Sequence, residues 1–136
     1  MEITVYQVQG RVSVTVLQPH GDVDASNYRD LIAKAQEVCN AGAQDILLDL
    51  SDIPFLSSSG LVALHSIARM LRGEQPPDPE SGWEAFRAIR RDRDRGPQQH
   101  LKLLNPQPRV DKVLETAGFK RFMEVYTDLE TAIASF

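Results

Sequence analysis

The sequence predicts an α/β fold in which a mixed, mostly parallel sheet is opened by a β-hairpin and packed against helices. Two N-terminal segments with alternating and β-branched residues predict the hairpin. Further along, short apolar runs at 45–50 and 101–104 have the composition of strands buried on both faces. A segment with helical spacing follows each run, and strands that alternate with helices pair in parallel.

Composition sets limits on the class of protein. With 136 residues, we expect a single domain over 1–136 that buries its own core. The net charge of −4 disfavours direct nucleic-acid binding, and the single cysteine, Cys39, excludes an internal disulfide. The sequence has no signal-peptide pattern and no apolar run near the roughly 20 residues that span a bilayer. We therefore expect a cytoplasmic protein with no membrane insertion.

The first half of the chain is predicted to hold three strands and two helices. A tight turn at Gln9 and Gly10 joins the first two strands, and the pattern breaks at 19–22. The first helix is closed by Gly42, and the second is indicated by apolar residues at helical spacing from Leu61 onward. The predicted bounds are 2–8, 11–17 and 45–50 for the strands, and 26–41 and 60–72 for the helices.

The C-terminal part is predicted to add two strands and two helices. Pro106 and Pro108 introduce the first of these helices after the strand 101–104, and Gly118 ends it. A final strand is predicted over 122–126. The last helix is expected to start with a capping box made by Thr127 and Glu130. Its inward residues are predicted to be Leu129, Ala132, Ile133 and Phe136.

A Pro- and Arg-rich segment at about 73–100 interrupts the alternation between the second helix and the fourth strand. It is long for a loop in a compact domain, so we expect a mobile excursion carrying one short helix over about 81–93. Its interleaved Arg and Asp residues, Asp92 included, predict a solvated mixed-charge face. Trp83 and Phe86 are either an interaction anchor or a packing contact. Without a continuous apolar face, the segment is expected to add little stability.

Three consecutive serines lie between the strand 45–50 and the helix that follows it. Ser58 and Ser59 lie near the predicted helix start, where backbone N–H groups lack acceptors and the helix dipole favours negative charge. The fold itself would tolerate a phosphoryl group there. The simpler interpretation is that Ser57, Ser58 and Ser59 only cap the helix.

The residues around these serines resemble the signature of STAS domains, the family of bacterial anti-sigma-factor antagonists. Residues 49–61 read DLSDIPFLSSSGL, and residues 21–24 read GDVD, like the family's Gly-x-Leu-Asp after its second strand. The resemblance covers about 1–72 and 101–136, so 73–100 looks like an insertion. The family's Asp before the phospho-acceptor serine is replaced by Ser57 in this chain.

The resemblance implies a STAS-like fold and a regulatory binding module that needs no cofactor and is no enzyme. The phospho-acceptor of the family corresponds to Ser58. Unphosphorylated, the protein would bind an anti-sigma-factor serine kinase; phosphorylation would end the association, and a phosphatase would restore it. The alternative is a STAS-like scaffold subunit, not phosphorylated, of a transporter or stressosome-like complex. The residues implied in partner binding are Asp24, Ser57, Ser59, Gly60 and Leu61.

Other polar residues have competing interpretations. Asp24 either has a functional role, contacting a partner or orienting the loop with the serines, or is the N-cap of the helix 26–41. Asp22, Asp49 and Asp52 could also suggest an acidic phosphate pocket like that of a receiver domain, but such a pocket requires a lysine after the last strand. The chain has Thr127 and Asp128 there, which disfavours this interpretation.

No enzyme constellation is evident in the sequence. The three histidines, His20, His65 and His100, are scattered without metal-ligand spacing, and His65 is expected at the surface or boundary of its helix. A Gly-x-Ser-x-Gly elbow and a phosphate-binding loop with Lys are both missing from the sequence. We therefore expect a binding protein and no metal site.

Overall fold

The computed structural model describes residues 1–74, 83–92 and 98–136, with the backbone alone for 83–86. Within these residues, five strands form one sheet in the order β1-β2-β3-β4-β5. The first pair is antiparallel and the other three pairs are parallel, which confirms the predicted mixed sheet opened by a hairpin. The strands are β1 (Glu2–Gln9), β2 (Ser13–His20), β3 (Ile46–Asp49), β4 (Leu101–Leu104) and β5 (Val125–Tyr126).

Both strands of the hairpin end later than predicted, at Gln9 and His20, and β2 begins two residues later, at Ser13. Gln9 pairs with Ser13, so three residues connect the strands, and the tight turn predicted at Gln9 and Gly10 is wrong. The N–H of Gly10 donates to the carbonyl of Val12 at 3.0 Å. β2 also continues beyond its predicted end, to His20. Pro19 does not interrupt the strand, because β2 pairs with β3 only as far as Leu17 and the N–H that proline lacks would have no partner there.

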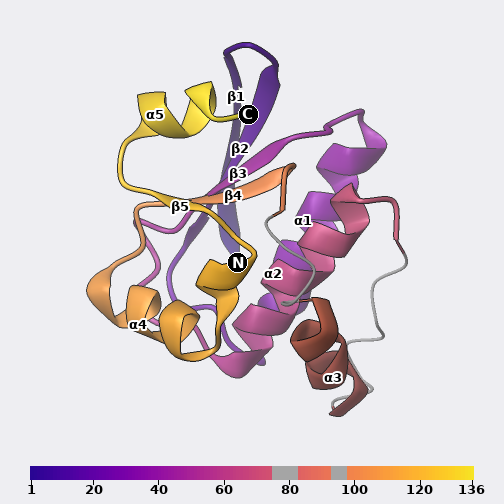
Figure 1. Cartoon of the computed structure of the whole chain (residues 1–136), viewed down its shortest axis with the longest axis vertical. Coiled ribbons are helices and arrows are strands. Elements are labelled where there is room, and N and C mark those ends of the chain that lie inside the picture. The colour runs from indigo at the N-terminus through magenta and orange to yellow at the C-terminus, as the bar shows by residue number, and fades with distance from the viewer. Residues whose placement is uncertain (75–82, 93–97) are drawn as a thin grey trace.

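Helices cover both faces of the sheet, as Figure 1 shows. The strand residues Leu17, Leu48 and Leu103 point into the larger core, under α1, α2 and α4. Their neighbours Val16 and Leu47 point to the opposite face, where α5 covers them. The alternation follows from the period of two along a strand, and it makes the central strands apolar on both sides. These helices are α1 (Tyr28–Asn40), α2 (Ser58–Leu71), α4 (Pro108–Thr116) and α5 (Leu129–Ala134).

The helix boundaries follow capping residues. α2 begins at Ser58, two positions earlier than predicted, because the side chain of Ser57 accepts a hydrogen bond from the N–H of Gly60. α4 has Pro108 in its first turn, and Gly118 follows it with φ of 78°, a left-handed conformation that favours glycine. Pro108 and Gly118, which the sequence predicts at the start and end of this helix, therefore do mark its two ends.

The predicted strand 122–126 is too long, because only Val125–Tyr126 pairs with β4. The chain instead makes a short 3-10 helix, η3 (Phe119–Arg121), directly after Gly118. Phe119 and Phe122 are fully buried, with ring centroids 5.0 Å apart. Phe122 thus anchors the larger core and is not available to extend the sheet.

The predicted cap of the last helix is also wrong. The N-cap is Asp128, whose carboxylate accepts bonds from the backbone N–H and the hydroxyl of Thr131 at 2.9 and 2.8 Å. Ala132 and Ile133 are buried as predicted, whereas Leu129 is 37% exposed. Leu129 is the first residue of the helix and lies beside the cap, outside the contact with the sheet.

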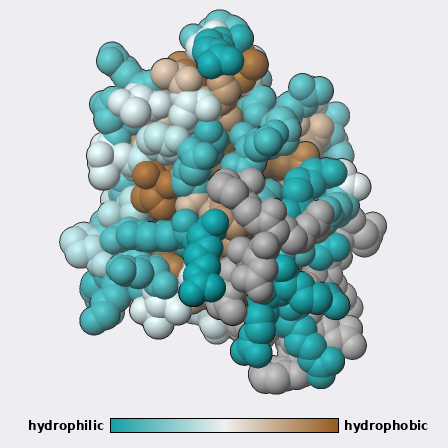
Figure 2. Space-filling view, viewed as in Figure 1, coloured by the Kyte–Doolittle hydropathy of each residue, from teal (hydrophilic) through white to brown (hydrophobic). Residues whose placement is uncertain are grey.

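The helix predicted within the insertion is present as α3 (Trp83–Asp92). Its side chains Ala88, Ile89 and Asp92 are buried, so the predicted solvated mixed-charge face is wrong at Asp92. The mobility predicted for 73–100 concerns mostly 75–82 and 93–97, which lie outside the described residues, as do the side chains of Trp83 and Phe86. None of the described helices is long and apolar enough to cross a membrane. The face in Figure 2 is mostly hydrophilic, with apolar residues in small separate patches.

Candidate functional site

The segment that connects β3 to the start of α2, called the serine loop here, lies beyond the carboxyl end of β3. It is fixed to the segment after β2. Val23 donates its N–H to the carbonyl of Phe55 at 2.9 Å and accepts from the N–H of Ser57 at 2.9 Å. A second contact joins the N–H of Gly21 to the carbonyl of Asp52 at 3.0 Å. The two motifs of the sequence, 21–24 and 49–61, therefore lie side by side at one edge of the sheet. This backbone pairing holds the loop in place without using its serine side chains.

Close packing under the loop explains the glycine of the motif. A Cβ atom on Gly60 would lie 2.3 Å from Cδ1 of Leu56 and 3.3 Å from Cγ1 of Val23. Both neighbours are buried, so the backbone of α2 can approach them only at a residue without a side chain. Gly60 is itself buried, which places it beneath the loop; Leu61 is 8% exposed.

The three serines have different environments. Ser57 is the N-cap, and its hydroxyl accepts from the N–H of Gly60 at 3.3 Å. Ser59 is half-buried. Ser58 is the first residue of α2; its side chain is exposed and makes no hydrogen bond to a described residue. The capping interpretation thus accounts for Ser57 alone and leaves the Ser58 hydroxyl accessible at a helix N-terminus.

Asp24 does not cap α1, whose N-cap is Asn27. Its carboxylate instead closes a turn before the helix, by accepting bonds from the N–H and the hydroxyl of Ser26 at 2.9 and 2.5 Å. These hydrogen bonds hold the pKa of Asp24 below its ordinary value. Asp24 therefore stays ionised near neutral pH, next to the segment that pairs with the serine loop.

A groove of about 740 Å³ opens between the start of α2 and the outer side of α4, which lie near each other in Figure 1. Phe55 is 39% exposed and lies at the groove beside Ser58. Arg109 and Lys112 of α4 are exposed and line it from the other side. The full lining is Phe55, Leu56, Ser57, Ser58, Leu61, Arg109, Lys112, Val113, Thr116 and Ala117.

The family model of the STAS domain matches residues 5–75, which contain most of β1 and all of β2, α1, β3, the serine loop and α2. The chain belongs to the STAS domain family. The predicted resemblance is therefore confirmed. The match includes both motifs at the sheet edge, the pair 21–24 and 49–61 that the backbone brings together.

Relatives of this STAS chain are assigned as anti-sigma factor antagonists. The protein BtrV of Bordetella bronchiseptica, assigned as one, is 26% identical over 136 residues, which is 100% of this chain and 95% of that protein. A crystal structure from Thermotoga maritima with the same assignment has 18% identity and a TM-score of 0.70, with 96% and 90% of the two chains covered. The phosphorylated form of the Bacillus cell-fate determinant SpoIIAA has 19% identity and a TM-score of 0.57, with 96% of both chains covered. The two structures show the fold, and none of these names describes an enzyme.

Sequence reasoning found the serines of the STAS domain but missed the other wall of the groove. Arg109 and Lys112 are separated from Ser58 by the whole insertion, and only the placement of α4 brings them to the same opening. The sequence could have indicated this wall, because loops that follow parallel strands share one edge of the sheet, and α4 follows β4, the strand next to β3. The spacing of three residues on one helix would then put both basic side chains on one face.

The histidines of the STAS domain are each paired with a carboxylate. His20 contacts Oδ2 of Asp52 at 2.5 Å and the hydroxyl of Thr4 at 2.7 Å, which ties the hairpin to the serine loop. His65 is 1% exposed, so the predicted surface or boundary position is wrong. Among the described residues, no three or more His, Cys, Asp or Glu side chains are arranged to hold a metal ion.

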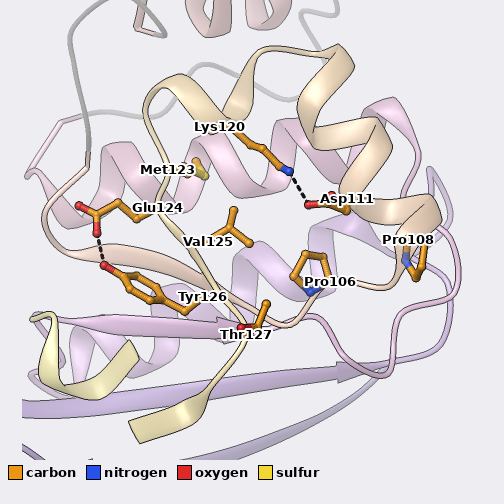
Figure 3. A pocket seen from close by; sticks show the side chains of 9 residues that line it. All are labelled: Pro106, Pro108, Asp111, Lys120, Met123, Glu124, Val125, Tyr126 and Thr127. Atoms are coloured by element: carbon orange, nitrogen blue, oxygen red, sulfur yellow. Dashed lines mark hydrogen bonds and ion pairs between the residues drawn. The ribbon is translucent and has the colours of Figure 1, made fainter. Parts of the chain in front are cut away.

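A second recess, of about 720 Å³, lies between α4, η3 and the segment around β5. Figure 3 shows that its polar side chains face one another, with Lys120 directed at Asp111 and the Tyr126 hydroxyl at Glu124. The Lys120–Asp111 distance is 2.8 Å, and the bond to Glu124 is the main cause that raises the pKa of Tyr126. These polar groups are mutually satisfied, so we assign no site to this recess.

Proposed function

We propose that this protein is an anti-sigma factor antagonist that binds an anti-sigma-factor kinase while Ser58 is unphosphorylated. The observation that carries the proposal is the environment of Ser58. Its hydroxyl is exposed, lacks a hydrogen bond to the described residues, and borders a groove with apolar and basic walls. A kinase could reach it without unfolding any part of the site.

Phosphorylation of Ser58 would change the surface more than the fold. A phosphate adds about −1.5 to −2 charges at neutral pH, and the N-terminus of a helix tolerates that charge. The loop is fixed by backbone bonds to Val23, so its geometry does not depend on the modified side chain. A partner that had covered the neutral hydroxyl would meet a buried, unpaired phosphate and dissociate. A phosphatase would reverse the change.

Ser57 fills the structural role of the Asp that is usual in the family motif. Serine and aspartate are comparably good N-caps, and Ser57 makes the capping bond to Gly60. The substitution removes a fixed negative charge next to the acceptor. The proposed switch therefore begins from uncharged side chains at positions 57 and 58, and the phosphate supplies the whole change in charge at this point.

The test is affinity purification from the native host with the wild-type chain and the Ser58→Asp variant. We expect a protein with an ATP-binding kinase domain to co-purify with wild type and to be lost with Ser58→Asp. Ser13→Asp is the matched control, because Ser13 is exposed at the start of β2, at the opposite end of the sheet. It should retain the partner.

The captured kinase is then incubated with ATP and the wild-type chain or Ser58→Ala. Mass spectrometry should locate one phosphate on Ser58 in wild type and none at that position in the variant. Transporter or stressosome subunits retained equally by wild type and Ser58→Asp would contradict the proposal and favour a scaffold role.

A further inference from the structure

Two basic side chains of α4 line the groove that holds the proposed phosphorylation site. Arg109 and Lys112 are exposed, line the same groove as Ser58, and form no ion pair with a described residue. Asp111, the carboxylate between them in sequence, is already paired with Lys120 at 2.8 Å. Among the described residues, the groove therefore holds two positive charges without a paired carboxylate, opposite an uncharged hydroxyl.

We propose that Arg109 and Lys112 bind the phosphate of phosphorylated Ser58 within the same molecule and thereby close the groove. The inference rests on the proposed function, since it needs Ser58 to be the acceptor. The inference adds a mechanism to that function: phosphorylation would act by drawing two cationic side chains over the docking surface, as well as by adding negative charge.

The chemistry of the three side chains fits this contact. A phosphoserine presents three acceptor oxygens, and the guanidinium of Arg109 can donate two parallel bonds to them. Lys112 can add a point charge from the next turn of α4. Both basic side chains have long apolar stems, which would lie over exposed Phe55 when their charged ends reach the phosphate. A partner would then lose the apolar surface on which it had docked.

The contact can be measured without the kinase. The probe is the purified chain with phosphoserine incorporated genetically at position 58, titrated by phosphorus-31 NMR. A free phosphoserine loses its second proton at a pKa of about 6, and nearby cations lower that value. We expect this second pKa to be lower by at least about 0.5 in the otherwise wild-type chain than in the double variant Arg109→Gln, Lys112→Gln. The difference should shrink in 1 M salt, where the screening length is about 3 Å.

The matched control is Arg11→Gln, which removes one positive charge from the exposed turn between β1 and β2. It should leave the phosphate titration unchanged. Equal titration curves for wild type and the Arg109/Lys112 double variant would overturn intramolecular capture. Binding of the captured kinase to both phosphorylated proteins is measured in parallel. If the phosphate still abolishes binding while the curves are equal, capture is wrong and the proposed function stands.

Discussion

The two ends of α2 hold their polar side chains in opposite ways. At its start, Ser58 is exposed and makes no hydrogen bond to a described residue. Toward its end, His65 is 1% exposed, and its Nε2 lies 2.6 Å from Oδ2 of Asp92 on α3. Arg69 and Arg72 reach the same carboxylate oxygen at 3.3 and 3.1 Å. One helix thus carries an open hydroxyl at one end and a closed ionic cluster at the other.

The charges of the cluster explain why it is stable in the folded protein. Arg69 and Arg72 balance Asp92 and Glu74, the latter 3.0 Å from Arg72. A neutral His65 can therefore donate its Nε2–H to Asp92 without adding a charge. Burial is the main cause that lowers the pKa of His65, and it outweighs the opposing effect of the Asp92 hydrogen bond. The difference between the ends is that the polar groups under α3 pair within the chain, whereas the exposed Ser58 hydroxyl is accessible, as the proposed phosphorylation requires.

Removing the shared carboxylate should have the largest effect. Asp92→Ala leaves His65, Arg69 and Arg72 without their common partner, and breaking a buried pair in this way costs about 3 kcal/mol of unfolding free energy. Urea denaturation measures the loss. The control is Asp111→Ala, which breaks the exposed pair with Lys120 and should cost about 0.5 kcal/mol. Equal losses for the two variants would contradict the contrast between the ends of α2.

The same cluster predicts a loss of stability in acid. With the pKa of His65 lowered, the unfolded chain binds the imidazole proton first, so unfolding free energy falls as pH drops below about 6.5. The slope for one proton is at most about 1.4 kcal/mol per pH unit. His65→Gln, which keeps a donor for Asp92, should flatten the curve between pH 7.5 and pH 5.5. A wild-type curve that is already flat there would contradict the neutral, buried imidazole.

A later decline in acid belongs to Asp92. Burial alone would raise its pKa, but the His65 hydrogen bond and the two arginines lower it overall. Its stabilising contribution is thus present above the ordinary carboxyl value and is lost as pH falls through the lower folded value. Asp92→Ala should make this second decline shallower in urea denaturation as a function of pH, and it should keep the lower stability at neutral pH; Asp24 and Asp128, whose pKa values are also lowered, account for the decline that remains.

Local patterns predicted most of the fold. The runs 45–50 and 101–104 gave two buried strands, because their apolar residues serve cores on both faces of the sheet. The errors lie where tertiary contacts decide. Phe122 was assigned to a strand by its composition, yet its ring packs on Phe119 in the larger core. At the last helix, Thr127 is predicted as the cap, but Asp128 is the N-cap because its carboxylate accepts both the N–H and the hydroxyl of Thr131.

The candidate site was only half predictable. Ser57 and Ser58 could be found because apolar residues at helical spacing mark the start of α2, where both serines lie. Asp92 lies 27 residues from His65, and a lone histidine and a mixed-charge run each resemble solvated surface until α3 packs on α2. The burial of Asp92 also revises the expectation that the insertion adds little stability. α3 also buries Ala88 and Ile89, the latter in the larger core, so its contribution combines apolar packing with an ionic pairing that periodicity does not reveal.

The smallest effect is expected at the other end of α2. Ser58→Asp should change the unfolding free energy by no more than about 0.5 kcal/mol, because Ser58 makes no bond that is lost and a carboxylate is favourable at a helix N-terminus. Urea denaturation at low and high salt measures it, with Ser13→Asp as the control without a helix dipole. A loss above about 2 kcal/mol would mean that the loop depends on this hydroxyl. Loss of the partner by the same variant would then report damage to the fold, and the open end of α2 would be as structural as its closed one.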